Sequence, residues 1–141
     1  MLENQQEILD QLNHLAKNTL VENLGIVFTQ ITHNSLSATM PVGPKTHQPY
    51  GLLNGGASAA LAENIGSYLS TTLVAHENKV AVGTSLTCNH LSGKIDGVVT
   101  GVGTIVRAGR NLHFCEIIIS DEKGKMICHA TMTNMIVPKP E

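Results

Sequence analysis

The chain has 141 residues, a length that suits one domain with a single hydrophobic core. Hydrophobic residues make up 42% of it and charged residues only 14%, and the net charge is −2. A charge so close to neutral gives no general electrostatic reason to bind nucleic acid. Because a small domain with few charges often buries surface between subunits, we expect a homo-oligomer.

The sequence shows no segment typical of a membrane or exported protein. No apolar run approaches the roughly 20 residues that span a bilayer, so we expect no membrane partner. Residues 1–18 are polar and lack the basic start and the continuous apolar stretch of a signal peptide, which favours the cytoplasm. The three cysteines have no CxxC spacing and are expected to be reduced and mostly buried: Cys88, Cys115 and Cys128.

The hydrophobic pattern predicts a helix, two strands, a second and longer helix, and then four strands. Apolar residues recur at helical spacing over 3–19, so an N-terminal helix is expected within residues 1–20. The first two strands are predicted at 24–33 and 35–42, where apolar and polar residues alternate. The remaining strands are predicted at 79–91, 95–107, 112–120 and 125–137.

The long helix is the central feature of the predicted fold. Residues 56–75 are rich in alanine and leucine and apolar nearly all round, which is typical of a buried helix. Asn54 is well placed to cap its first turn. Runs of strands with one segregated helix favour an α+β fold, with a largely antiparallel sheet wrapped around that helix. No linker interrupts the pattern, so one domain is expected over 1–141.

Glu63 is the first candidate for chemistry. Histidine aside, it is the only side chain with a formal charge between Thr46 and His76. Burial of a carboxylate among alanines costs several kcal/mol unless it is paired, hydrogen-bonded or protonated, so Glu63 is a candidate general base or nucleophile. The alternative is a helix face that reaches solvent, or a structural hydrogen bond. Ser67 lies four residues later and shares the face of Glu63.

The start of the long helix is the second candidate. Helix N-termini carry unpaired N–H groups, and a glycine such as Gly55 lets a ligand carbonyl approach the backbone, as in an oxyanion hole. The alternative is a loop that needs glycine for its conformation. In the preceding loop, Gln48 either donates to a carbonyl or satisfies backbone groups. His90, in a predicted strand, is by itself more typical of a structural histidine. The motifs of nucleotide, zinc and serine-hydrolase sites are missing, so no cofactor or metal is expected.

Residues 46–67, THQPYGLLNGGASAALAENIGS, closely resemble the PaaI-like hotdog thioesterases. The resemblance extends to short matches at 82–84, 89–91 and 108–111. It implies a hotdog fold and hydrolysis of acyl-CoA, aryl-CoA or acyl-carrier thioesters. It also implies a dimer or a dimer of dimers, with each active site between two subunits.

The same resemblance implies a role for each matching residue. Glu63 supplies the carboxylate that attacks the thioester or activates water, and Gly55 supplies the N–H for the developing oxyanion. Gln48 positions the carbonyl, Ser67 assists the water or the acyl group, and His90 falls in the strand that lines the pocket. Glu63 comes from one subunit, and Gln48 with Gly55 from the other.

The sequence departs from the family pattern at two places. Asn54 stands where the family usually has a histidine, and an asparagine cannot become a cation near neutral pH. Residues 92–93 are Ser-Gly where relatives often carry Arg-Pro, so Arg107 and Arg110 are the remaining candidates to hold CoA phosphates. Their alternative is ordinary surface charge. Tyr68, near Glu63 in the sequence, is a candidate substrate contact.

Two other functions are compatible with a hotdog fold. The replacement at Asn54 keeps open a non-catalytic module that binds or senses acyl-CoA. A dehydratase or hydratase is the third reading, although its usual histidine-bearing motif is missing from the long helix. The retained Glu63 and Gln48 favour the thioesterase, because a module that only binds has no need of a buried carboxylate.

Overall fold

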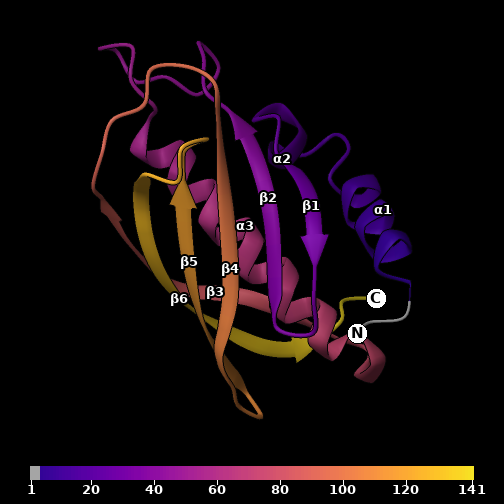
Figure 1. Ribbon diagram of the computed structural model, residues 1–141. Coiled ribbons are helices and arrows are strands. Elements are labelled where there is room, and N and C mark those ends of the chain that lie inside the picture. Colours follow the sequence, from indigo (N-terminus) through magenta and orange to yellow (C-terminus); the bar gives the residue numbers. More distant parts are fainter. Residues whose placement is uncertain (1–3) are drawn as a thin grey trace.

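The computed structural model describes residues 4–141, which form a curved antiparallel sheet packed against one long helix (Figure 1). Three α-helices and one 3₁₀ helix are present: α1 (Gln5–Leu15), α2 (Leu20–Asn23), α3 (Gly55–Val74) and η1 (Ala75–Glu77). The six strands are β1 (Val27–Ile31), β2 (Ser35–Pro41), β3 (Lys79–His90), β4 (Val98–Ala108), β5 (Leu112–Ser120) and β6 (Met126–Pro138). The predicted α+β fold is therefore confirmed.

The six strands form one sheet in the order β1-β2-β4-β5-β6-β3, and every neighbouring pair is antiparallel. Helix α3 lies across one face of this sheet and contacts β2, β3, β4, β5 and β6 (Figure 1). The core fills the space between them. Its fully buried members include Leu61, Ile65 and Leu69 of the helix, which pack with Ile117, Ile119 and Met132 of the sheet.

The N-terminal helix is shorter than predicted. The sequence predicts a helix over 3–19, but α1 ends at Leu15 (residue 3 lies outside the described residues). Asn18 adopts a left-handed backbone with φ of 61°, and the Thr19 side chain accepts the Val21 N–H as the cap of a new helix, α2. Apolar periodicity continues through this break, which is why the pattern alone predicted one helix. No helix of residues 4–141 is long and apolar enough to cross a bilayer.

Most predicted strands match the structure to within a few residues, and glycines explain two exceptions. Gly25 and Gly97 have positive φ angles of 73° and 78°. Such a backbone ends an extended segment, so β1 begins at Val27 rather than at residue 24, and β4 begins at Val98 rather than at residue 95.

The two edges of the sheet differ. At β1, the side-chain amide of Asn13 on α1 donates to the Phe28 carbonyl and accepts the Phe28 N–H, both at 2.9 Å. Helix α1 therefore occupies that edge. Strand β3 at the other edge pairs only with β6, and most of its residues are exposed. An open edge of this length is a template for pairing with another chain.

A small polar cluster lies within the core between α3 and β5. The Asn134 side-chain nitrogen donates to the Gly66 carbonyl at 3.1 Å and to the Ser70 hydroxyl at 2.9 Å. His113 is its register partner on β5, and both side chains are buried. Burial lowers the pKa of His113 below its ordinary value of 6.5, because the charged imidazolium loses hydration.

This burial predicts a loss of stability on acidification. The unfolded chain binds a proton at His113 at a higher pH than the folded chain does, so stability falls as the pH drops below 6.5. We expect the melting temperature of the wild type to fall from pH 7.5 to pH 5.5, and that of His113→Gln to fall less. The matched control is His33→Gln, at an exposed histidine. Equal losses in the wild type and His113→Gln would contradict the prediction.

Candidate active site

The first turn of α3 has one N–H group left for a ligand. The Asn54 side chain accepts the Gly56 N–H at 2.7 Å, which confirms the predicted cap. The Asn54 carbonyl accepts the N–H groups of Ala57 and Ser58 at 3.0 and 3.2 Å. Within residues 4–141, no acceptor lies within hydrogen-bond distance of the Gly55 N–H. The helix N-terminus therefore presents a single N–H donor with a favourable dipole behind it.

The loop before α3 is fixed from two sides. The buried Thr46 accepts the Asn54 N–H through its carbonyl at 2.8 Å, and its hydroxyl donates to the Pro41 carbonyl at 2.9 Å. Leu53 donates its N–H to the Lys94 carbonyl, at 2.7 Å, in the loop that follows β3. The start of α3 is thereby anchored to both β2 and the segment after β3.

Gln48 lies half-buried in this loop and has one of its two polar groups engaged. Its side-chain oxygen accepts the Tyr50 N–H. The side-chain NH₂ group is then the part that can donate to a carbonyl of a ligand. The two interpretations of Gln48, a loop-stabilising residue and a ligand contact, are compatible because the amide has both an acceptor and a donor.

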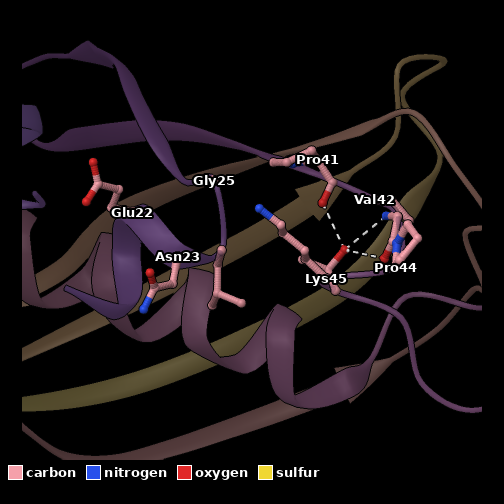
Figure 2. A pocket seen from close by; sticks show the side chains of 10 residues that line it. Glu22, Asn23, Gly25, Pro41, Val42, Pro44 and Lys45 are labelled. Carbon is pink, nitrogen blue, oxygen red and sulfur yellow. Dashed lines mark hydrogen bonds between the residues drawn. The ribbon is translucent and has the colours of Figure 1, made fainter. Parts of the chain in front are cut away.

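The pocket in Figure 2 lies on the α2 side of this loop. It has a volume of about 410 Å³ and is lined by residues of α2, the end of β2 and the loop, among them Glu22, Pro41 and Lys45. A smaller pocket of about 280 Å³ shares Lys45 with it and reaches Asn54 at the start of α3. Glu63 lines neither of them, and no residue of α3 lines the larger of the two.

His90 ends β3 beside the start of α3. A Cβ atom built on Gly55 would lie 3.0 to 3.3 Å from three atoms of the His90 ring, closer than ordinary van der Waals contact. The absence of a side chain at Gly55 therefore lets the imidazole approach the helix backbone. His90 thus lies beside the helix N-terminus, and its predicted place in a strand that lines the pocket stays a prediction.

Glu63 is exposed, so the prediction of a buried carboxylate is wrong for the single chain. The sheet covers one side of α3 only, and the small residues on the other side resemble core residues in the sequence. The carboxylate lies against β3, where a Cβ built on Gly83 would be 2.7 Å from its Oε1. Sequence analysis missed Gly83, because only the fold brings this strand beside the helix.

The predicted residues of α3 do not form one site within a single chain. Eight residues separate Gly55 from Glu63, which places them about 12 Å apart along the helix axis. Ser67 is half-buried and follows Glu63 by one helical turn. The Tyr68 ring packs against Phe28 with centroids 4.8 Å apart, and burial raises its pKa. Tyr68 therefore points toward β1, away from the side that carries Glu63.

Arg107 and Arg110 lie at the far end of the sheet. They line a pocket of about 470 Å³ around the β4–β5 turn, together with Phe114 and Thr133. Arg110 also lines a hollow beside the last turn of α3. Gly55 lies at the other end of this 20-residue helix, so neither arginine reaches the helix N-terminus of its own chain (Figure 1).

The cysteines are unpaired, as predicted, and two of them meet near Glu63. Cys88 of β3 and Cys128 of β6 influence each other, and burial is the main cause that raises the pKa of both thiols, that of Cys128 to about 12. The charge of Glu63 further raises the pKa of Cys88. These thiols are poor nucleophiles. Within residues 4–141, no group of three or more histidine, cysteine or carboxylate residues is placed to hold a metal ion.

A curved antiparallel sheet around one long helix, with an N–H donor at the helix start and a carboxylate beside the edge strand, is the architecture of a hotdog hydrolase. The model of the thioesterase superfamily matches residues 50–128. The proofreading thioesterase EntH of Cronobacter sakazakii is 42% identical over 129 residues, which are 92% of this chain and 93% of that protein.

Solved structures agree with this match. A variant of thioesterase PA1618 from Pseudomonas aeruginosa superposes with a TM-score of 0.91 and 41% identity, over 98% of this chain and 99% of that one. Thioesterase HI1161 from Haemophilus influenzae gives a TM-score of 0.90 and 38% identity, over 94% and 92%. The chain therefore belongs to the PaaI-like hotdog family of the thioesterase superfamily and is a thioester hydrolase.

The cap of α3 yields a stability prediction. In Asn54→Ala the Gly56 N–H loses its acceptor, so we expect a loss of about 1 kcal/mol in the free energy of unfolding. Asn54→Ser keeps a side-chain oxygen at the cap and should lose much less. Urea denaturation of the three proteins, followed by circular dichroism, measures this difference. An Ala variant as stable as the wild type would show that the cap contributes nothing.

Proposed function

We propose that this thioester hydrolase acts on acyl-CoA, aryl-CoA included, with Glu63 as the catalytic carboxylate and the Gly55 N–H as the oxyanion donor. The observation that carries the proposal is the free N–H at the start of α3, together with the lone carboxylate on the exposed face of the same helix. In the reaction, Glu63 adds to the carbonyl carbon, or removes a proton from a water that does so. The C–S bond then breaks, the thiol leaves, and water supplies the oxygen of the acid.

The site requires two copies of the chain. A carbonyl cannot lie about 3 Å from both an N–H and a carboxylate that are about 12 Å apart on one rigid helix. The exposed β3 edge offers a way to bring a second helix alongside. Gly83 lies beside Glu63 and His90 lies beside Gly55. Antiparallel pairing of two β3 strands about a point midway between these residues places the Glu63 side of one copy opposite the Gly55 side of the other.

Two solved neighbours support the choice of Gln48 and Glu63. Structures of a Staphylococcus aureus thioesterase, 30 to 31% identical to this chain with a TM-score of 0.82, are of a glutamine-to-alanine and a glutamate-to-alanine variant. The two substituted positions are fifteen residues apart, the spacing that separates Gln48 from Glu63. We infer that Gln48 donates to the thioester carbonyl and that Ser67 holds the water or the acyl group.

The other predicted contacts fit a site completed by further copies. His90 lies beside Gly55, so we propose that it lines the substrate pocket next to the oxyanion donor. Arg107 and Arg110, far from Gly55 in their own chain, are proposed to hold CoA phosphates of a site to which another copy contributes. Tyr68 is proposed to limit the acyl pocket from the core side, since its ring is fixed by Phe28.

The central test is thiol release from a panel of aliphatic and aromatic acyl-CoA esters. Glu63→Gln keeps the shape of the side chain and removes its charge, so we expect turnover to fall by at least about 1000-fold while the melting temperature and oligomer size are unchanged. The ranking of the panel in the wild type identifies the acyl class. Wild-type turnover in Glu63→Gln would overturn the assignment of the carboxylate.

Subunit mixing tests whether the site is shared. Glu63→Gln and Gln48→Ala are each expected to be inactive, whereas an equal mixture refolded together contains hybrid dimers with one intact site. Statistical assembly predicts recovery of about a quarter of wild-type activity. The control is the same mixture without refolding. No recovery, in a mixture shown to form hybrids, would place both residues in a site within one chain.

A further inference from the structure

The carboxylate of Glu63 rests on a surface of β3 that has no side chain. A Cβ atom at Gly83 would lie 2.7 Å from Glu63 Oε1 and 3.1 Å from Met132 Cε. Ordinary van der Waals contact begins near 3.4 Å, so the space in front of the Gly83 backbone is already filled by these two groups. The end of the exposed Glu63 side chain therefore lies close to β3 at Gly83.

The strand is locally distorted at this place. The pairing of β3 with β6 shifts register between Gly83 and Ser85, so Thr84 is an extra residue in the ladder. The Thr84 hydroxyl donates to the Thr133 carbonyl at 3.1 Å and holds the bulge to its neighbour. Bulges of this kind bend a strand and redirect its backbone, and they are frequent beside active sites.

Met132 is the second side chain that fills the space in front of Gly83. It is 1% exposed, and its sulfur would lie 2.3 Å from a Cβ at Gly66 of α3, while its terminal methyl faces Gly83 of β3. Two glycines on two different elements therefore leave room for one long side chain. Because a buried methionine in a packed core is held on all sides, Met132 has little room to move away from a methyl group added at residue 83.

We propose that Gly83 is a positioning residue for the catalytic carboxylate, and that the missing side chain at the β3 bulge sets where Glu63 meets the thioester. This inference rests on the proposed catalytic role of Glu63. A methyl group at residue 83 pushes the carboxylate outward by roughly 1 Å, toward the second copy, and a displacement of that size costs up to about 100-fold in rate.

The test is Gly83→Ala, with kcat and KM measured on the best ester of the acyl-CoA panel. We expect kcat to fall by about 10- to 100-fold with KM changed by less than about threefold, because the substrate contacts remain while the carboxylate moves. Gly43→Ala is the matched control, since a Cβ at Gly43 meets nothing within 4 Å. It should keep the wild-type kcat.

A second comparison separates displacement of the carboxylate from damage to packing. Gly66→Ala crowds the same Met132 without touching Glu63. We expect it to lower the melting temperature at least as much as Gly83→Ala does, but to lower kcat less. An equal loss of kcat at equal loss of stability in the two variants would overturn the proposal, because the effect would then come from the core.

A double substitution decides whether the effect passes through Glu63. Glu63→Asp shortens the side chain by one methylene, so its carboxylate no longer reaches the space before residue 83. Gly83→Ala should then cost less than about threefold in the Glu63→Asp background. The same fold-loss in both backgrounds would refute the positioning role. If Glu63→Gln keeps wild-type turnover, the proposed function fails; if it is inactive but Gly83→Ala keeps its kcat, only this inference fails.

Discussion

The open edge of β3 beside the uncovered face of α3 is the constraint on which the rest of the molecule depends. A six-stranded sheet covers one side of a 20-residue helix and leaves the other side with small residues and one carboxylate. Because this face of the helix has few large apolar side chains, its exposure to solvent within a single chain costs little free energy. This face does lie beside an edge strand that pairs with β6 only and whose outer side has no neighbouring strand. Edge and helix face together form the surface at which we propose that a second copy completes the site.

The two edges of the sheet differ in whether another strand can pair with them. Asn13 mimics a neighbouring strand at β1, because its amide donates to and accepts from the same residue, Phe28. A single short polar side chain therefore covers the β1 edge. At β3, the Thr71 hydroxyl of α3 accepts the Ala81 N–H at 3.0 Å near the start of the strand, and the part that follows pairs only with β6. In the proposed dimer, pairing at the β3 edge gives a closed pair rather than an open fibre, because α1 occupies the other edge of the sheet.

Local patterns in the sequence predicted the order of the elements and the cap at Asn54, because each depends on neighbours within a few residues. The exposure of Glu63 could not be read from the same patterns. Whether a helix of small residues is covered on one side or on all sides depends on the curvature of the sheet. The proximity of Gly83 to Glu63 could not be predicted for a related reason. The bulge after Gly83 shifts the alternation of inward and outward side chains along β3, and the two residues are 20 positions apart in the sequence.

Asn54, which replaces the histidine usual in the family, supplies the acceptors for most N–H groups in the first turn of α3. The asparagine oxygen takes the Gly56 N–H, and the asparagine carbonyl takes the next two. Only the Gly55 N–H is left, and Gly55 lies beside His90 at the end of β3. A neutral cap therefore does not compete with an oxyanion for that donor, and it adds no charge beside the leaving thiolate. In the proposed site, stabilisation of the leaving group then comes from the helix dipole and from groups of the second copy, so we expect the rate of hydrolysis to depend on assembly.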